Sequence, residues 1–403
     1  WGVPLPIFIS KSDGKVLVDE DVFENIASIY EKEGSDCWFS DDPQKFLGDK
    51  YKAKDYVKLK DIVEVWFDSG STHSFVLEKR EDLKWPASMY LEGSDQHRGW
   101  FHSSLLESCG TRGRAPYESI LSHGFVMDGK GLKMSKSLGN QIFPEDILKK
   151  YGADILRVWV AASDYSEDLR IDYSILDQHA EAYRKIRNTF RYLMGNINDN
   201  YLEQEYNKID LIKLPELEKL MLHKLYVLSE KFNTNFKEYN FHALYKELLN
   251  FCTVDLSSFY FDIRKDTLYC DNKNSEKRQN CILILKTILD ALLKWFAPIL
   301  SFTTEEIFSL LNQDEKNSIH LKKFPEFPKS WKNEELYKNW EKINKIRDIT
   351  NISIEEKRAA KIIGSSLETA VDIKLSKDLY DLAKNYDFSE ICITSLANVV
   401  LDE

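Results

Sequence analysis

The hydrophobic pattern of the chain changes near residue 173, and this change decides which kinds of domain the chain forms. Between residues 86 and 165, short apolar runs alternate with helical patterns and glycine turns. That alternation is typical of a parallel α/β sheet. After residue 173, apolar side chains recur every three or four residues, as they do along one face of a helix. The sequence therefore predicts an α/β part followed by an all-α helix bundle.

Apolar stripes locate the helices of the second part. The clearest stripes are Tyr183, Ile186, Phe190 and Leu193; Leu217, Leu220, Met221, Leu225, Leu228 and Phe232; and Leu285, Ile288, Leu289, Leu292 and Phe296. Pro298 is expected to end the last of these helices. Thr303, followed by Glu306, has the spacing of a capping box and predicts the start of another helix. One more helix is expected near residues 335–360.

Short strands are expected elsewhere. Residues 1–9 alternate apolar and other side chains, and residues 62–67 are a strand candidate that ends in the turn Asp68–Ser71. The tail, residues 363–403, mixes strand-like runs with one helical pattern and predicts the start of a small α/β module. Its strand-like runs are Ala370–Leu375, Glu390–Thr394 and Ala397–Leu401.

The charge balance limits what the chain binds. Lys and Arg number 55 against 66 Asp and Glu, so the formal charge is −11. This excludes a uniformly basic nucleic-acid coat but allows a local basic groove. Charged residues interrupt every apolar run, so we expect no membrane span. Six cysteines without a close pair indicate reduced thiols in a cytoplasmic protein and offer no metal site.

Residues 128–140, DGKGLKMSKSLGN, carry the strongest chemical signal. The glycines allow a mobile hairpin-like loop, on which Lys133 and Lys136 place two ammonium groups beside the hydroxyls of Ser135 and Ser137. This set suits a triphosphate whose charge shifts toward the leaving pyrophosphate. Lysines that contact the phosphates as that charge develops stabilise the transition state. They therefore lower the reaction barrier and do more than tighten binding. A lysine-rich glycine loop without such context is more often a solvated loop.

Residues 90–101, YLEGSDQHRGWF, predict a strand-to-helix junction. Tyr90 and Leu91 end a strand, Gly93 allows a tight turn, and Ser94 or Asp95 is a candidate cap of the next helix. Ligands of open α/β sheets bind at the carboxyl ends of strands, so this junction is a candidate ligand site.

Residues Lys133–Ser137, KMSKS, match the signature of class I aminoacyl-tRNA synthetases, and residues 90–101 most closely resemble the isoleucine-specific members of that class. Further similar segments are Trp1–Pro6, Val65–Ser71, Tyr183–Phe190, Ser258–Asp271, Ala297–Glu306 and Ile363–Glu368. The resemblance implies the second half of a Rossmann-type nucleotide-binding catalytic fold, an anticodon-binding helix bundle and the start of a small α/β junction module. It implies activation of isoleucine with ATP and Mg²⁺, and transfer to tRNA(Ile).

The resemblance also implies roles for individual residues. Lys133 and Lys136 are the catalytic residues; Lys136 with Ser135 binds ATP. The adenylate contacts are Glu92, Gly93, Asp95 and Gln96. The walls of the isoleucine pocket are Trp1 and Trp100. A basic stripe at helical spacing is expected to contact tRNA phosphates and comprises Arg184, Lys185, Arg187 and Arg191. A solvated helix face is the alternative interpretation of this stripe.

The resemblance also implies how the chain divides into domains. Residues 1–160 form the C-terminal half of the catalytic domain, with a connective insert at residues 10–65. Residues 161–205 form a stem-contact region, residues 206–350 the anticodon-binding bundle, and residues 351–403 part of a C-terminal junction module.

The chain has no HIGH sequence and no editing insert, and it ends before any cysteine-rich zinc module. We therefore expect a C-terminal fragment of a cytoplasmic, monomeric synthetase that is inactive alone, with zinc only in a C-terminal module absent here. The alternatives are a non-catalytic tRNA-binding or scaffold fragment, a valine-specific relative, and an adenylyltransferase outside the synthetases.

Overall fold

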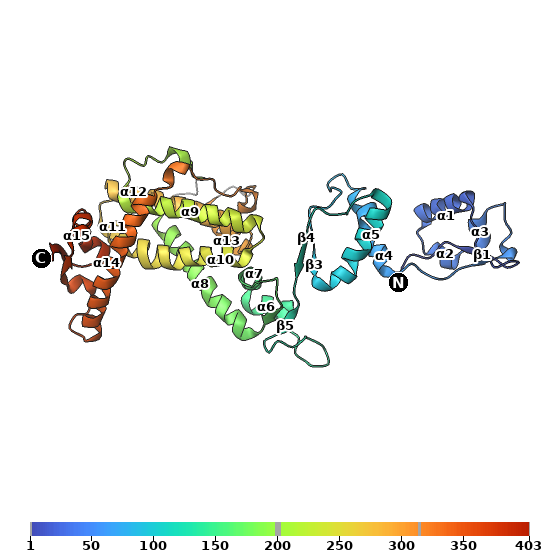
Figure 1. The fold of residues 1–403 in the computed structure, drawn as a ribbon, viewed down its shortest axis with the longest axis horizontal. Helices are drawn as coiled ribbons and strands as arrows, with labels where there is room; N and C mark the ends of the chain where they lie inside the picture. Colours follow the sequence, from blue (N-terminus) through green and yellow to red (C-terminus); the bar gives the residue numbers. More distant parts are fainter. Residues whose placement is uncertain (1, 198–202, 313–315, 403) are drawn as a thin grey trace. The chain divides into compact units, whose positions relative to one another are not determined.

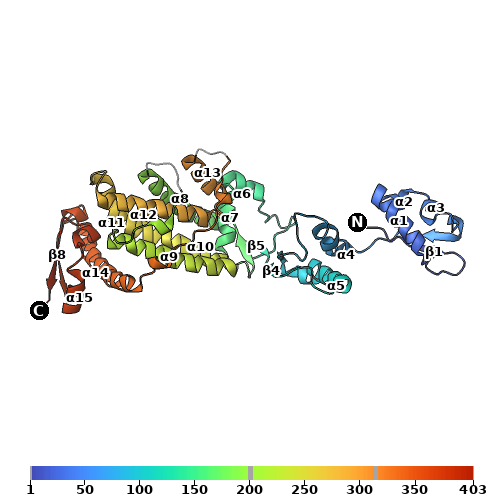
Figure 2. The same cartoon turned by 90° about the horizontal axis from the view of Figure 1, so that it is seen from above.

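The computed structural model describes residues 2–197, 203–312 and 316–402. Trp1, which was predicted to line the isoleucine pocket, lies outside the described residues. The chain divides into two compact units. Unit 1 is Trp1–Phe125 with Ser166–Asp168, and unit 2 is Val126–Tyr165 with Leu169–Glu403. Figures 1 and 2 show the elements of each unit from two directions.

The first part of unit 1 is built on a small antiparallel sheet. Strand β1 (Phe8–Ser10) pairs with β2 (Tyr56–Lys58), which confirms extended structure within residues 1–9. Three α-helices lie between the two strands in sequence: α1 (Glu20–Glu33), α2 (Cys37–Ser40) and α3 (Pro43–Leu47). The rings of Phe8, Trp38 and Phe46 meet in a core of their own, with centroids 5.1 and 5.0 Å apart.

The second part of unit 1 contains a parallel strand pair. Strand β3 (Tyr90–Gly93) runs parallel to β4 (Ile120–His123), with Gly93 opposite His123. A parallel pair needs a crossover connection, and helix α5 (Trp100–Arg112) provides it. This β-α-β unit is the α/β arrangement that the sequence predicts.

The predicted strand at residues 62–67 is wrong. Helix α4 (Val65–Gly70) occupies its second half and the predicted turn after it, and the Glu64 carboxylate caps this helix by accepting a hydrogen bond from the Trp66 N–H at 2.7 Å. Ile62 makes only an isolated bridge, to Pro4. Glu64 interrupts the apolar run, and the cap that it provides outweighs the preference of valine and aromatic residues for strands.

Unit 2 begins with a second parallel pair, β5 (Val126–Asp128) and β6 (Leu169–Ile171). Helices α6 (Pro144–Tyr151) and α7 (Ala153–Ala162) connect the two strands. Ile147, Trp159 and Ile171 share a buried cluster, so the strand pair and its helices pack as one piece.

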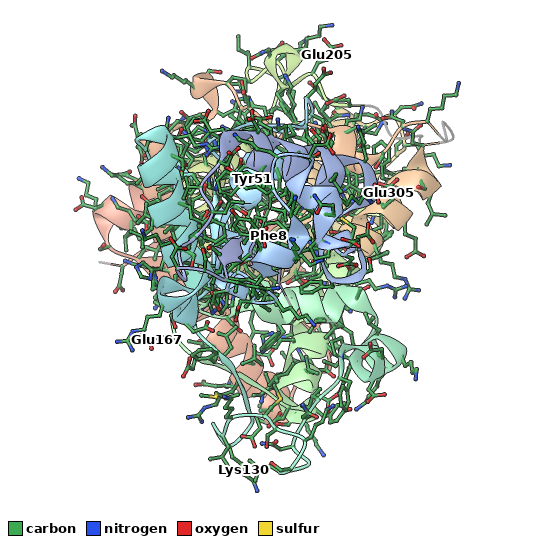
Figure 3. All side chains as sticks on the ribbon, turned by 90° about the vertical axis from the view of Figure 1, so that its right-hand side faces the viewer. Phe8, Tyr51, Lys130, Glu167, Glu205 and Glu305 are labelled. Carbon is green, nitrogen blue, oxygen red and sulfur yellow. The ribbon has the colours of Figure 1, made fainter. Side chains whose placement is uncertain are left out.

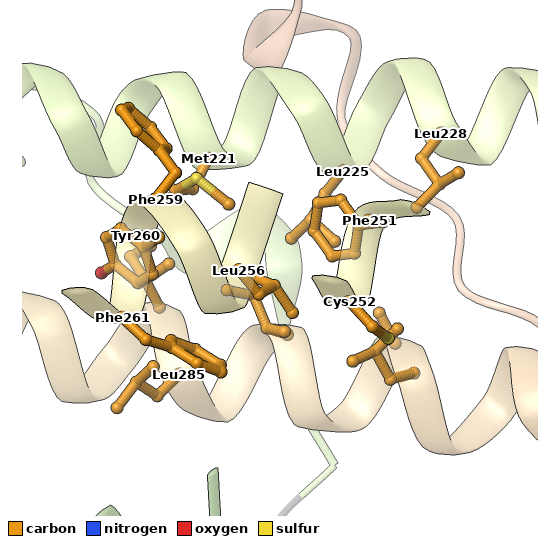
Figure 4. Close-up of a cluster of buried hydrophobic side chains, with 14 of the residues drawn as sticks. Met221, Leu225, Leu228, Phe251, Cys252, Leu256, Phe259, Tyr260, Phe261 and Leu285 are labelled. Atoms are coloured by element: carbon orange, nitrogen blue, oxygen red, sulfur yellow. The ribbon is translucent and has the colours of Figure 1, made fainter. Parts of the chain in front are cut away.

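The helix bundle follows, as the apolar stripes predict. Its helices are α8 (Tyr173–Asn196), α9 (Glu216–Lys237), α10 (Phe241–Asn250), α11 (Phe261–Cys270), α12 (Glu276–Phe296), α13 (Ser301–Leu311) and α14 (Glu334–Ala359). A π-helical segment, Phe251–Tyr260, joins α10 to α11. Figure 4 shows Leu225, Leu256 and Leu285, from three of these segments, in the common core.

The capping box predicted at Thr303 is wrong. Helix α13 already begins at Ser301, so Thr303 lies inside its first turn. The cap comes from Asp154 in α7. Its Oδ2 accepts hydrogen bonds from the Thr303 N–H at 2.8 Å and the Thr303 hydroxyl at 2.6 Å, while its Oδ1 accepts one from the Phe302 N–H at 3.3 Å. A carboxylate that is distant in sequence therefore satisfies the free amides of this helix end.

The tail forms a small α/β module. Strands β7 (Ala370–Leu375) and β8 (Leu396–Leu401) are parallel, and α15 (Lys377–Ala383) and α16 (Phe388–Cys392) lie between them in sequence. The strand predicted at Glu390–Thr394 is wrong, because the Asp387 carboxylate caps α16 through the Ser389 and Glu390 amides. In the described part of the chain, no helix combines the length and apolar character that a membrane span requires.

Candidate functional site

The KMSKS segment of unit 2 extends from a tight hairpin. Asp128 ends β5, and its Oδ1 accepts hydrogen bonds from the Lys130 N–H at 3.0 Å and the Leu132 N–H at 2.8 Å. Gly131 has a φ of +81°, a backbone conformation that favours glycine. Lys130 lies at the outer turn (Figure 3). The start of the loop is therefore held by its own backbone and one carboxylate.

Asn140 holds the other end of the loop. Its Oδ1 accepts a hydrogen bond from the Ser135 N–H at 3.0 Å, and its Nδ2 donates to Asp128 Oδ2 at 2.8 Å and to the Lys133 carbonyl at 3.3 Å. The hydrogen bond from Asn140 is the main cause that lowers the pKa of Asp128, followed by that from the Leu132 amide. Sequence reasoning missed Asn140 as a site residue, although it is the last residue of the segment 128–140.

The two predicted catalytic lysines are exposed on this loop. Neither Lys133 nor Lys136 has a side-chain hydrogen bond or ion pair to any residue among those described in unit 2. Ser135 Oγ lies 3.1 Å from Ser137 Oγ and accepts a hydrogen bond from the Leu138 N–H at 3.3 Å. The loop thus presents two unpaired cations on an internally bonded backbone, which is the arrangement that an anionic ligand requires.

The base of the hairpin touches the helix that carries the basic stripe. A side chain at Gly129 would overlap the carboxylate of Asp172. Asp172 is the N-cap of α8, where its Oδ1 accepts a hydrogen bond from the Ile175 N–H at 2.7 Å. The signature loop and α8 therefore share a direct contact, and only glycine fits at this point.

The predicted adenylate contacts lie together at the end of β3 in unit 1. Glu92 Oε2 accepts a hydrogen bond from the Gly93 N–H at 2.9 Å, and a Cβ atom at Gly93 would lie 2.7 Å from Asp95 Oδ1. Gln96 Oε1 accepts a hydrogen bond from the Trp100 N–H at 2.9 Å. The structure thus brings the four predicted residues, Glu92, Gly93, Asp95 and Gln96, to one turn.

The cap predicted at Ser94 or Asp95 is wrong. These residues belong to a short 3₁₀ helix, Ser94–Arg98, and α5 begins after Gly99 without a side-chain cap from that residue. Gln96 satisfies the first amide of α5 instead. Its carbonyl oxygen is used in this way, while its amide nitrogen keeps its donors for a ligand.

Two tryptophans stand at this junction. The Trp100 ring stacks on Tyr90 with centroids 4.1 Å apart, and its Nε1 donates a hydrogen bond to the Ser69 carbonyl at 3.0 Å. The Trp66 ring lies against Gly99, where a Cβ atom would be 3.1 Å from its Cη2. Trp66 is 40% exposed, so part of its face is open. Sequence reasoning missed Trp66, although it lies in the VWFDSGS segment.

The predicted tRNA-contacting residues divide between two sides of α8. Arg184, Arg187 and Arg191 recur at helical spacing and are exposed, and Arg184 pairs with Glu181. Arg187 and Arg191 line a cavity of about 330 Å³. Lys185 faces a different cavity of about 620 Å³.

That larger cavity has both polar and apolar walls and lies between α8 and the segment from Cys252 to Tyr269. Its lining includes Lys185, Asn188, Lys265 and the largely exposed Tyr269. Tyr192 stacks on Phe261 at its wall, with ring centroids 4.2 Å apart. Lys265 is paired with Asp262, which also lines the cavity, at 3.1 Å. Lys185, beside aromatic faces and an amide, is a cation that suits a nucleotide phosphate.

Acidic, thiol and imidazole groups do not cluster into a metal site within residues 2–197, 203–312 and 316–402. The described cysteines are all free thiols.

Comparison with known proteins gives two matches along the chain. Residues 1–172 match the class I tRNA synthetases (I, L, M and V), and residues 218–375 match the anticodon-binding domain of tRNA ligases. The isoleucine–tRNA ligase of Pelagibacter ubique is 72% identical over 399 residues, which are 99% of this chain and 44% of that protein. That of Mesorhizobium japonicum is 47% identical over 98% of this chain and 39% of that protein. The chain thus spans less than half the length of these relatives.

Solved structures show the same fold. A LeuRS–tRNA–LeuAMS ternary complex from Agrobacterium radiobacter K84 has a TM-score of 0.62 at 16% identity, over 83% of this chain and 42% of that chain. Mycobacterium tuberculosis methionyl-tRNA synthetase with methionyl-adenylate has a TM-score of 0.51 at 15% identity, over 77% of this chain and 67% of that chain. The predicted Rossmann-type α/β fold followed by a helix bundle is confirmed.

Proposed function

The chain belongs to the class I tRNA synthetases, and we propose that its gene product activates isoleucine with ATP and transfers it to tRNA(Ile). The observation that carries this proposal is the signature loop, whose Lys133 and Lys136 are unpaired among the described residues while Asp128 and Asn140 hold its backbone. Specificity for isoleucine is supported by the relatives, which are isoleucine–tRNA ligases.

In the proposed activation step, a carboxylate oxygen of isoleucine attacks the α-phosphorus of ATP. The bond from that phosphorus to the oxygen that bridges to the β-phosphate breaks, and pyrophosphate leaves with the electron pair. The nucleophile is already ionised, so no general base is needed. Negative charge grows on the leaving pyrophosphate, and Lys133 and Lys136 would stabilise it most in the transition state. ATP would enter as its Mg²⁺ complex.

The junction in unit 1 would hold the aminoacyl-adenylate. Glu92 and Asp95 offer carboxylate acceptors for an ammonium group and for ribose hydroxyls, and Gln96 offers its amide donors. Trp66 and Trp100 would bound the side chain of the amino acid, since both rings flank the start of α5. The flat faces of these two rings carry no polar group. They would exclude larger side chains by shape and offer a β-branched side chain an apolar surface.

The helix bundle would bind tRNA. Arg187 and Arg191 are exposed cations for backbone phosphates, and the cavity that Lys185 lines suits an unstacked base. The acidic balance of the whole chain means that such binding is local. Affinity is therefore expected to fall as salt rises, with a slope set by these few cations.

The test is amino-acid-dependent exchange of pyrophosphate into ATP, measured with isoleucine, valine, leucine and methionine separately. We expect exchange by the full-length gene product to be fastest with isoleucine. Fastest exchange with valine would favour the valine-specific alternative, and no exchange with any of the four would refute the proposed reaction.

A second candidate function is non-catalytic tRNA binding by these 403 residues alone. It is favoured by the absence of a HIGH sequence from them, because ATP would then be held by only part of the usual set of groups. Near-attack positioning accounts for roughly 7–11 kcal/mol of such barriers. We expect the chain by itself to give no measurable exchange but to bind tRNA weakly; rapid exchange would contradict this expectation.

A further inference from the structure

Strand β5 places an arginine on the same face of the sheet as a signature lysine. Met127, in the middle of β5, pairs with Arg170 in β6 on one side and bridges to Lys133 on the other. Side chains of directly paired residues project to the same face. Neighbouring strands lie about 4.8 Å apart, so the backbones at Lys133 and Arg170 are about 10 Å apart. Both side chains are exposed.

The Arg170 guanidinium reaches across the sheet to the signature hairpin. A Cβ atom at Gly131 would lie 3.4 Å from both Nε and Nη2 of Arg170 and 3.5 Å from its Cζ. These three nearly equal distances place the flat side of the guanidinium over the glycine. The arginine thus lies against the turn from which Lys133 and Lys136 extend.

The donors of this guanidinium have no protein acceptor. Among residues 2–197, 203–312 and 316–402, Arg170 forms no side-chain hydrogen bond and no ion pair. Two carboxylates at the hairpin are already bonded: Asp128 to Asn140 and two amides, and Asp172, which contacts Gly129, to Ser174 and the Ile175 amide. Packing against glycine therefore orients the guanidinium and leaves its fork of donors open.

We propose that Arg170 is a third phosphate-binding cation of this loop, which contacts the triphosphate of ATP together with Lys133 and Lys136. The inference rests on the proposed activation reaction. An arginine fork binds two phosphate oxygens at once, which a lysine does not do. Its place beside Lys133 directs it to the β- and γ-phosphates, and it stabilises the charge that the pyrophosphate carries away when the bond to the α-phosphorus breaks.

The test compares Arg170→Ala and Arg170→Lys in the full-length gene product. We expect Arg170→Ala to lower kcat/KM for ATP in isoleucine-dependent exchange by about 10²-fold, the scale found for one lost charge-stabilising donor. Arg170→Lys should recover part of this loss. The matched control is Lys149→Ala, which removes one exposed positive charge from α6 in the same unit and should leave exchange unchanged.

A binding measurement with pyrophosphate tests the role of Arg170 independently of the proposed reaction. Equilibrium dialysis with labelled inorganic pyrophosphate needs no turnover, and we expect Arg170→Ala to weaken binding at least tenfold relative to wild type and to Lys149→Ala. If wild type shows no exchange, the proposed reaction fails, while the dialysis still decides the role of Arg170. Unchanged pyrophosphate binding would overturn the proposal. So would normal exchange with reduced tRNA charging, which would assign Arg170 to tRNA instead.

Discussion

Removing the Asp154 carboxylate should destabilise unit 2 strongly, because this side chain joins three helices. Asp154 lies in α7 and is 7% exposed. It accepts two hydrogen bonds from Thr303 and one from the Phe302 amide at the start of α13. The Thr303 hydroxyl also lies 2.9 Å from the Tyr183 hydroxyl of α8. Asp154→Ala would leave the Thr303 N–H buried without this acceptor and the Thr303 hydroxyl with Tyr183 alone.

The expected size follows from these bonds. A hydrogen bond to a charged group contributes about 1.5–3 kcal/mol, and two of the three bonds are short. The long bond from Phe302 adds little. We therefore expect Asp154→Ala to lower the free energy of unfolding by about 3–5 kcal/mol. Asp154→Asn keeps one acceptor oxygen but turns an amide donor toward other donors, so it should cost about 1–3 kcal/mol.

The assay is thermal unfolding of the whole chain, followed by circular dichroism at the helix band. For a domain of this size, each kcal/mol moves Tm by about 2–4 °C, so Asp154→Ala should lower the transition of unit 2 by about 6–20 °C. The control is Asp146→Ala in the exposed first turn of α6, which removes the same charge but should cost no more than about 1 kcal/mol. Adding Thr303→Val to Asp154→Asn completes a double-mutant cycle, which should show coupling between the two residues.

Two results would refute this reasoning. An Asp154→Ala variant that unfolds within about 1 °C of wild type would mean that water replaces the carboxylate at no cost. Additive effects of Asp154→Asn and Thr303→Val would mean that the two side chains do not interact in solution.

Three further predictions concern the site and the core. Lys136→Ala in the full-length gene product should slow adenylate formation by about 10²–10³-fold with a much smaller change in ATP affinity, because in the proposed role the lysine would act on charge that develops in the transition state; stopped-flow kinetics that place the whole loss in ATP binding would contradict this. Trp66→Ala and Trp100→Ala should both weaken isoleucine activation and relax discrimination against bulkier amino acids, measured as ratios of kcat/KM in pyrophosphate exchange; unchanged ratios would show that the rings only pack. Burial raises the pKa of Cys252 from 9.0 to about 12. The unfolded chain therefore loses this proton at lower pH than the folded chain, and stability should fall as pH rises from about 9 toward 12. Cys252→Ala should flatten that fall in denaturant titrations, and an equally steep fall in the variant would assign it to other groups.

Long helices were predictable because each repeats its signal many times. The stripes of α8, α9 and α12 carry enough apolar positions to outweigh any single residue, and the structure buries them as expected. The strands β7 and β8 were also found, since β-branched side chains lie between clear breaks in the tail. The signals for these elements lie in the local sequence.

Short elements and caps were not predictable in the same way. Residues 62–67 and 390–394 have apolar side chains that suit a strand, yet Glu64 and Asp387 cap helices there. The cap of α13 comes from Asp154, which lies 149 residues before Thr303 and offers no sequence signal. Such contacts depend on tertiary packing, so residue spacing does not show them.

The same distinction between contiguous segments and tertiary contacts applies to the candidate site. The KMSKS loop and the Glu92–Gln96 turn could be proposed from the sequence because they are contiguous segments whose residue types suit phosphate and adenylate chemistry. Asn140, Trp66 and Arg170 could not be proposed from the sequence, because what singles them out is what they touch in the fold: the loop backbone, Gly99 and Gly131.

Charging of tRNA tests the central claim most directly. Purified full-length gene product would be incubated with ATP, tRNA and labelled isoleucine or valine, and acid-precipitable aminoacyl-tRNA would be counted, beside a variant in which Lys133 and Lys136 are both alanine. We predict ATP-dependent formation of isoleucyl-tRNA, little stable valyl-tRNA, and loss of charging in the double variant. Absence of isoleucyl-tRNA, or equal charging by the double variant, would contradict the assignment of this loop to isoleucine activation.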